Sequence, residues 1–381
     1  MADETLTPSV IEIREVRTRG DLRRFVAFPE RLYARHPRYV PKLAGEELAA
    51  LSAARNPAFE YCEARCWMAF RDGEPVGRIA GIINQRYIET WGLRRARFGW
   101  FDFVDAPAVP AALLGEVESW ARARGLDAVH GPLGFCDLDR EGMLVKGFDE
   151  MDLLITNYNH PYYPAHLESL GYRKDVDWIE FEVPLPPVLP PGIGRVSRVV
   201  LGRTGLRLLE TRHRRDLLPH VPGIFALVNE AYQHLYGVVT ISDRQIASYT
   251  KSFFGFINHE YVKIILDASG RVVAFGIGMP SLSRALQRCR GRLFPFGFLH
   301  LIRALRRSDR LDLLLIAVRP ELQNKGVPAV IIHEMWKACL KNGIRHAESG
   351  PQLETNEKIN AMWIPFRPRQ HRRRRCYLKP L

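Results

Sequence analysis

The turn Gln323–Val327 carries the residues whose types and spacing most directly suggest chemistry. It follows a continuous apolar run, Leu313–Val318, which is typical of a strand buried on both faces. After it, Val327, Ile331, Met335 and Ala338 recur at helical spacing. A turn between a strand and a helix N-terminus presents successive backbone N–H groups at the positive end of the helix dipole, which favours phosphate or pyrophosphate binding. The alternative is a plain strand-to-helix connection that contains a glycine.

The elements around this turn indicate a mixed α/β domain. Tyr261–Leu266 and Arg271–Met279 are predicted to be two strands joined by a tight turn. Downstream, Ile344–Glu348 is expected to form another strand, Asn356–Phe366 a short helix and Cys376–Leu378 a closing strand.

This order of elements and the run Val318–Gly326 resemble the acyl-CoA pyrophosphate motif of the GNAT acyltransferase superfamily. Gln323 and Gly326 match the motif, while Pro328 fills its last small-residue position and removes one N–H donor. The resemblance implies a pyrophosphate held in the turn and a pantetheine arm lying between two splayed strands. The residues expected to bind the acyl-CoA are Ala317, Val318, Gln323, Asn324, Lys325, Gly326, Val327 and Ala329.

The catalytic residues expected from this resemblance are Glu348, Glu354 and Asn356. Glu348 is the first choice for the base that accepts the amine proton, because the superfamily places acids at strand ends beside the thioester. Salt bridges with nearby arginines are the alternative for both glutamates, and helix capping is the alternative for Asn356. The position at which the family often carries a tyrosine general acid holds Trp363, whose indole cannot protonate a thiolate. No residue is therefore assigned as the general acid.

Length and composition limit the class of protein. The 381 residues suit two domains, and 46% of them are hydrophobic, which is enough for buried cores. No run reaches the ~18–20 apolar residues needed to cross a bilayer, and the N-terminus lacks the pattern of a signal peptide. The six cysteines show no metal-binding spacing, so we expect free thiols in the cytoplasm and no metal.

The net charge of +13 is concentrated in two arginine-rich segments, 284–310 and 367–375. Such density indicates an anionic partner: CoA phosphates, an acidic carrier protein, an anionic membrane surface or nucleic acid. The alternative is a solvated basic face. Nucleic acid is the least favoured partner, because the basic runs lack interleaved aromatic residues.

A proline-rich segment, 184–195, divides the chain into halves whose strand and turn patterns repeat in the same order. We therefore expect an α/β fold with a mixed sheet and two tandem GNAT-like domains, 1–183 and 196–381. The first half has no Gln-x-x-Gly turn after its strand 98–104, so it is predicted to be degenerate. Its polar loop 131–163 is interpreted as closing over the acyl site from the acceptor side, or as an ordinary surface loop.

The second half contains an insertion, 281–310, in which phenylalanines and leucines are flanked by arginines. This pattern suits a helix lying in a membrane interface, a lid over an apolar channel, or an extra core helix. With the turn at Gln323–Val327 and the segment Glu348–Asn356, it resembles the duplicated GNAT proteins that include the bacterial ceramide synthases.

That narrower resemblance implies N-acylation of a lipophilic primary amine, a sphingoid base, by a long-chain acyl-CoA or acyl-carrier protein at the inner membrane. The alternatives are an acetyl or aminoacyl transferase acting on a small amine, and a non-catalytic nucleic-acid-binding protein with a degenerate GNAT fold.

Overall fold

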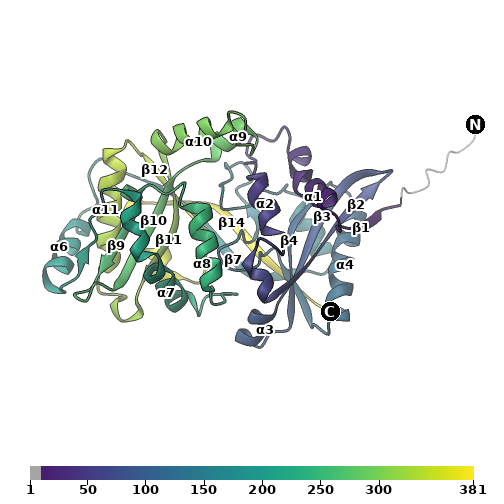
Figure 1. The fold of residues 1–381 in the computed structure, drawn as a ribbon, viewed down its shortest axis with the longest axis horizontal. Coiled ribbons are helices and arrows are strands. Elements are labelled where there is room, and N and C mark those ends of the chain that lie inside the picture. Colours follow the sequence, from purple (N-terminus) through teal and green to yellow (C-terminus); the bar gives the residue numbers. More distant parts are fainter. Residues whose placement is uncertain (1–9) are drawn as a thin grey trace, which may run out of the picture.

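One mixed β-sheet runs along the length of the molecule (Figure 1), in a computed structural model that describes residues 10–381. The strands of the first half are β1 (Glu12–Glu15), β2 (Cys62–Arg71), β3 (Glu74–Asn84), β4 (Arg95–Phe103), β5 (Ala128–Gly131), β6 (Met143–Lys146) and β7 (Arg173–Pro184). Those of the second half are β8 (Arg207–Leu208), β9 (Val262–Leu266), β10 (Val272–Pro280), β11 (Arg310–Val318), β12 (His346–Ser349), β13 (Gln352–Leu353) and β14 (Arg369–Pro380).

Helices cover both faces of this sheet. In the first half they are α1 (Arg19–Leu32), α2 (Ala44–Ala50), α3 (Gln85–Trp91), α4 (Ala108–Ala123) and α5 (Tyr163–Ser169). In the second half they are α6 (Ile193–Arg203), α7 (Val221–Tyr232), α8 (Asp243–Phe253), α9 (Ser283–Cys289), α10 (Gly297–Arg306), α11 (Val327–Lys341) and α12 (Glu357–Ala361). The predicted spacing on α11 is confirmed, because Val327, Ile331, Met335 and Ala338 are all buried.

The strand order is β1-β2-β3-β4-β5-β14-β7-β12-β11-β10-β9-β8. The neighbours β4–β5 and β11–β12 are parallel, and the other neighbours in this order are antiparallel. Each half thus repeats the same order of antiparallel strands followed by a parallel pair. The predicted duplicated α/β architecture is confirmed by this repeat.

The two halves exchange their last strands. β14, at the end of the chain, pairs with β5 of the first half, with Tyr377 opposite Gly131. β7, which ends the first half, pairs with β12 of the second half, with Val183 opposite Ala347. β7 and β14 also pair with each other along their length, at the centre of the molecule (Figure 1). Neither half therefore completes its sheet alone, and the division of the chain at 184–195 stays a prediction.

Arg372–Arg375, four of the six arginines of the C-terminal basic segment, lie inside β14 and pair with acids of the protein itself. The assignment of this segment to an anionic partner stays a prediction. Arg372 and Arg374 are almost fully buried, and their Nε atoms donate to the two carboxylate oxygens of Glu180 at 2.7 and 2.5 Å. Arg373 and Arg375 pair with Asp177 on the opposite face of the strand. The acids of β7 neutralise this charge, which offsets the cost of removing the guanidinium groups from water.

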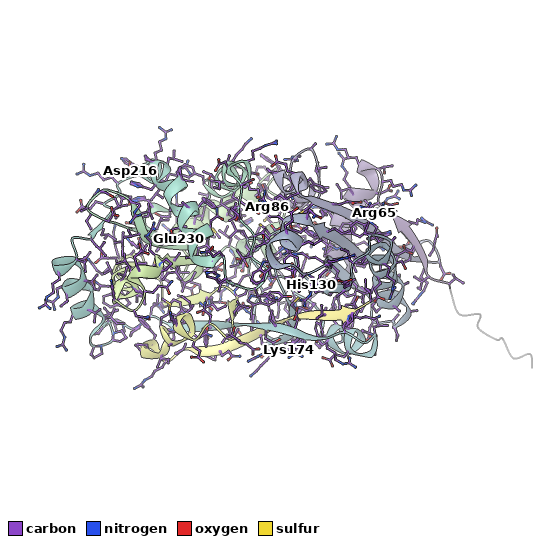
Figure 2. The ribbon with its side chains drawn as sticks, turned by 90° about the horizontal axis from the view of Figure 1, so that it is seen from below. Arg65, Arg86, His130, Lys174, Asp216 and Glu230 are labelled. Carbon is purple, nitrogen blue, oxygen red and sulfur yellow. The ribbon has the colours of Figure 1, made fainter. Side chains whose placement is uncertain are left out.

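Side chains of the first half also reach the loop between α7 and α8. Arg86 of α3 donates to the carbonyl oxygen of Thr240 at 2.5 Å, and Figure 2 shows it near the middle of the long axis. Trp91 donates to the carbonyl oxygen of Val238 at 2.9 Å. These contacts attach the loop that carries Tyr236 to the first half.

Candidate active site between the two halves

A cavity of about 1370 Å³ lies in the second half and is closed on one side by the first half. Its walls come from β11, α7, α8, α11 and the segment 350–366, and most of its lining side chains are apolar. Residues of the loop 131–163 and of β7 complete the wall. Ordinary small-molecule sites measure roughly 300–1,000 Å³, so this cavity has room for a ligand with a long aliphatic chain.

The cavity opens where β11 and β12 separate. Their parallel pairing ends at Leu313 and Ser349. Just beyond this point β11 has a β-bulge at Leu314. Ile277 of β10 pairs with Leu315 and Gly278 pairs with Leu313, so Leu314 has no partner on β10. From there to Val318, β11 pairs with β10 alone and faces the cavity on its free side.

The corresponding gap in the first half is filled by its own backbone. The pairing of β4 with β5 ends at Arg97 and His130, and the N–H of Leu133 then donates to the carbonyl oxygen of Phe98 at 2.8 Å. At Gly99 a Cβ atom would lie 2.4 Å from the carbonyl oxygen of Leu133. The chain itself therefore occupies the space next to β4 at this point, and the pocket recorded beside it, of about 240 Å³, is much smaller than the cavity of the second half.

The turn Gln323–Gly326 has the geometry expected of an anion site. Asn324 and Gly326 are both left-handed, with φ of 63° and 76°, and Gly326 is the N-cap of α11. Within residues 10–381, no acceptor is recorded for the backbone N–H of either residue. Lys325 is exposed beside the turn, and Lys358 of α12 lies 3.4 Å from the side-chain oxygen of Gln323. Free N–H donors at a helix start, with two lysines nearby, suit a pyrophosphate.

The cavity lining includes six of the eight residues predicted to bind the cofactor: Ala317, Val318, Gln323, Asn324, Gly326 and Ala329. Lys325 projects to solvent, and Val327 is fully buried in the core under α11. Their assignment to cofactor binding stays a prediction.

The two glutamates predicted to be catalytic do not line the cavity. Glu348 is buried, and its two oxygens accept hydrogen bonds from Arg310 and Arg372, each at 2.8 Å. Glu354 accepts from Lys174 and Arg373. Although burial opposes it, these two cations hold the pKa of Glu354 below its usual value. Ion pairing, the alternative for both residues, accounts for their positions, and a catalytic role for either is untested.

Asn356 and Trp363 do line the cavity. The Asn356 side chain caps α12 by accepting from the N–H of Ile359 at 3.5 Å. The Trp363 indole donates to the side-chain oxygen of Gln352 at 3.2 Å. Both residues therefore shape the wall, and a catalytic role for Asn356 stays a prediction.

Two carboxyl groups that sequence reasoning did not single out face the cavity from the first half. Asp137 and Glu141 belong to the loop 131–163 and line the cavity. Neither has a hydrogen bond or an ion pair with any described residue, in contrast to the neighbouring Asp139, which accepts from the N–H groups of Phe135 and Cys136. The acids of this loop were visible in the sequence, but which of them stay unpaired depends on tertiary contacts.

Burial gives these two carboxyl groups unusual acidities. It raises the pKa of Asp137 to about 6. Burial, together with the nearby Asp137, raises the pKa of Glu141 well above its ordinary value. The one buried cation close by, Arg97, donates to the carbonyl oxygens of Gly134 and Gly237 rather than to a carboxylate. This wall therefore favours a proton or a cationic ligand.

A third polar group on the wall is Tyr236, from the loop between α7 and α8. Its hydroxyl donates to Asp175 at 2.5 Å and lies 2.8 Å from Nδ1 of His130, which Figure 2 labels. His130, Asp175 and Cys376 lie close enough to be considered as metal ligands. The tyrosine hydroxyl bonds to the first two and lies 3.5 Å from the sulfur of Cys376, while Nε2 of His130 has no hydrogen-bond partner among the described residues.

The fold and the cavity define the class of the protein, which is a tandem GNAT fold. A solved tandem GNAT protein from the clavulanic acid biosynthesis pathway superposes with a TM-score of 0.57 at 12% identity, covering 97% of this chain and 98% of the other. No protein-family model matches the chain.

Two curated relatives match over nearly the full length. Protein YghO of Escherichia coli (strain K12) is 28% identical over 378 residues, covering 97% of this chain and 95% of that protein. Bacterial ceramide synthase of Caulobacter vibrioides is 26% identical over 362 residues, covering 93% of each. The resemblance predicted from the motifs is confirmed, and these similarities support an acyltransferase of the GNAT type.

Proposed function

We propose that the protein is an N-acyltransferase that moves a long-chain acyl group from acyl-CoA or an acyl-carrier protein to a lipophilic primary amine, a sphingoid base. One observation carries the proposal: a single large apolar cavity has free N–H donors at Asn324 and Gly326 on one wall and unpaired carboxyls at Asp137 and Glu141 on another. The similarity to a bacterial ceramide synthase supports the sphingoid base as acceptor and a ceramide as product.

The donor would be held by the second half alone. The N–H groups of Asn324 and Gly326 would bind its phosphates, with Lys325 and Lys358 adding positive charge. The free side of β11 would lie along the donor's arm. The apolar lining and the volume of the cavity suit a long acyl chain, whereas an acetyl group would leave most of that space empty.

The acceptor would be held by the first half. A primary amine arrives as an ammonium ion, and the unpaired carboxylate of Asp137 attracts it. Asp137 then takes one proton, which leaves a neutral amine that can act as a nucleophile. The amine nitrogen bonds to the thioester carbonyl carbon, the carbon–sulfur bond breaks, and Glu141, whose raised pKa favours the protonated form, donates a proton to the leaving thiolate. The proton that the new amide nitrogen still carries passes to the Glu141 carboxylate, which restores its protonated form.

We further propose that the protein acts on the cytoplasmic side, where CoA thioesters are made, in peripheral contact with the inner membrane. Among residues 10–381, no helix has the length and apolar character needed to span a bilayer. An amine with a long aliphatic chain partitions into lipid, so the enzyme has to reach its acceptor at a membrane surface.

The test is amide formation by the purified protein from palmitoyl-CoA and sphinganine or 3-ketosphinganine, with mass detection of the product and release of free thiol. Amide is expected with the parent protein and at least ~10²-fold less with Asp137→Asn. Asp149→Asn, an exposed acid of the same loop outside the cavity, is the matched control and should match the parent protein. Turnover of acetyl-CoA on a small amine, without long-chain products, would overturn the lipid assignment.

A further inference from the structure

The insertion that contains α9 and α10 exposes a group of large apolar side chains. Phe294 and Phe296 are 81% and 71% exposed, and Leu299 is 52% exposed. Together with Phe298 and Ile302 they form what we call the α10 patch. Single exposed apolar residues are common on protein surfaces, but a contiguous group within nine residues marks a contact surface.

The α10 patch is held outward by the other face of the insertion. Leu301 of α10 is buried in a cluster with Met279, Leu282 and Leu286. Gln287 of α9 donates to the carbonyl oxygens of Pro37 and Tyr39 in the first half. Figure 1 shows α9 and α10 along one edge of the molecule. The insertion is therefore anchored to both halves, and the patch faces away from the core.

Exposed arginines lie close to the α10 patch along the chain. There is no Asp or Glu from Ser281 to Ser308. Within this span Arg292 pairs with Glu30, but no ion pair with a described residue is recorded for the exposed arginines 284, 288, 290, 303, 306 and 307. Unlike the buried arginines of β14, these arginines of the basic segment 284–310 keep their charge available to a partner.

We propose that the α10 patch and its arginines dock the protein on an anionic lipid bilayer. Aromatic and aliphatic side chains would enter the boundary between headgroups and acyl chains, while the arginines would contact the anionic headgroups. Charge complementarity favours this occupant over a second copy of the chain, because two copies would bring like-charged arginines together. This inference rests on the proposed function for the identity of the acceptor, a lipophilic amine. It adds the surface by which the protein would reach the membrane that contains this amine.

The α10 patch lies close to the candidate active site. Leu314 of β11 packs against the cluster that contains Leu301, and it also lines the large cavity. The cluster beneath α10 and the cavity wall therefore have Leu314 in common. A lipid amine in the docked membrane would be close to the site where it reacts.

The test is sedimentation of the purified protein with vesicles of phosphatidylcholine, with and without phosphatidylglycerol. We expect binding to vesicles that contain phosphatidylglycerol and weaker binding at high salt. The triple variant Phe294→Ser/Phe296→Ser/Leu299→Ser and the variant Arg303→Glu/Arg306→Glu/Arg307→Glu should each reduce binding at least tenfold. Val188→Ser/Ile364→Ser is the matched control, because these residues are 76% and 67% exposed elsewhere, and it should bind as the parent protein does.

Absence of vesicle binding by the parent protein, or equal losses in the control, would overturn the docking surface. So would a concentration-dependent dimer that the Phe/Leu triple variant abolishes. Amide formation from detergent-dispersed amine is measured in parallel and should be unchanged in the triple variant. Vesicle binding without any amide formation would refute the proposed function and leave the docking surface standing, so the two failures are distinguishable.

Discussion

Arg372 lies 2.8 Å from Glu348, guanidinium Nη2 to carboxylate Oε2, and both side chains are buried. The other oxygen of Glu348 accepts from Arg310 at the same distance. Both oxygens of Glu348 are therefore engaged by guanidinium groups, which is the ion-pairing alternative to a catalytic role. Its contacts join β14, β12 and β11, so the residue preferred as a base from the sequence occupies the junction between the two halves.

For Glu348→Gln we therefore expect a loss of stability, on the order of 3 kcal/mol in the free energy of unfolding, because buried arginines lose a charged partner. Urea unfolding at pH 7 measures it. The rate of acyl transfer by the folded Glu348→Gln variant should rise with pH at the same midpoint as in the parent protein. A stable variant whose rate no longer rises with pH would restore Glu348 as the base.

Asp137 should instead set the pH dependence of the reaction. Burial raises its pKa to about 6, and only the ionised form accepts a proton, so kcat/KM should rise with pH through about 6 and level off above it. In Asp137→Asn this rise should disappear, and Asp149→Asn should retain it. The measurement is the initial rate of thiol release between pH 5 and 8. A parent profile that is flat from pH 5 to 7 would contradict the assignment.

Asp312 should make the stability of the protein depend on pH. It is buried in β11 beside Glu348, and no hydrogen bond reaches its oxygens from a described residue. Burial, with the added repulsion of Glu348, raises its pKa to about 7. The folded protein therefore holds a proton that the unfolded chain releases near pH 4, and this stabilisation is lost as pH rises from about 4 to about 7.

The corresponding variant is Asp312→Asn, which removes the titration. Its stability relative to the parent protein should increase as pH rises, and at pH 8 it should exceed the parent by ~1–3 kcal/mol. Thermal unfolding of both proteins at pH 4.5, 6 and 8 measures the difference. A constant difference across these pH values would show that Asp312 has an ordinary acidity.

Gly326 should be sensitive to any side chain. Its φ is 76°, and a Cβ atom would lie 2.7 Å from Cγ1 of Val196 on α6. Gly326→Ala should therefore lose ~1 kcal/mol from backbone strain, lose more from the collision, and bind acyl-CoA at least tenfold more weakly. Gly326→Trp would disturb the packing of α6 as well as the turn. Gly326→Ala is therefore the cleaner test of phosphate binding by the turn Gln323–Gly326.

Gly73→Ala is the matched control for this change, because Gly73 has φ of 79° and nothing within 4 Å of the added Cβ. It carries the same backbone strain without a collision, far from the cavity. Calorimetric titration with CoA and thermal unfolding compare the two variants. Equal donor affinity in Gly326→Ala and Gly73→Ala would exclude the turn as the phosphate site.

Local patterns predicted much of the second half. The apolar run of β11, the turn at Gly326 and the buried face of α11 all follow from residue spacing within about 25 positions. The candidate base was harder to predict, because a carboxylate stays free to accept a proton only where no cation or N–H group is bound to it. Glu348 and Asp137 are both acids near strand ends or turns in the sequence, and only the three-dimensional arrangement leaves Asp137 unpaired.

By itself the sequence determined the duplicated order of strands and helices, the Gln323–Gly326 turn and the amphipathic segments, because each depends on short-range periodicity and on the backbone preferences of single residues. Only the tertiary structure decided that β7 and β14 exchange places, that the arginines of β14 are buried against Glu180, and that Asp137 shares a cavity with Gln323. These outcomes join residues up to about 250 positions apart. They depend on which surfaces become buried together, and no local pattern in the chain specifies that.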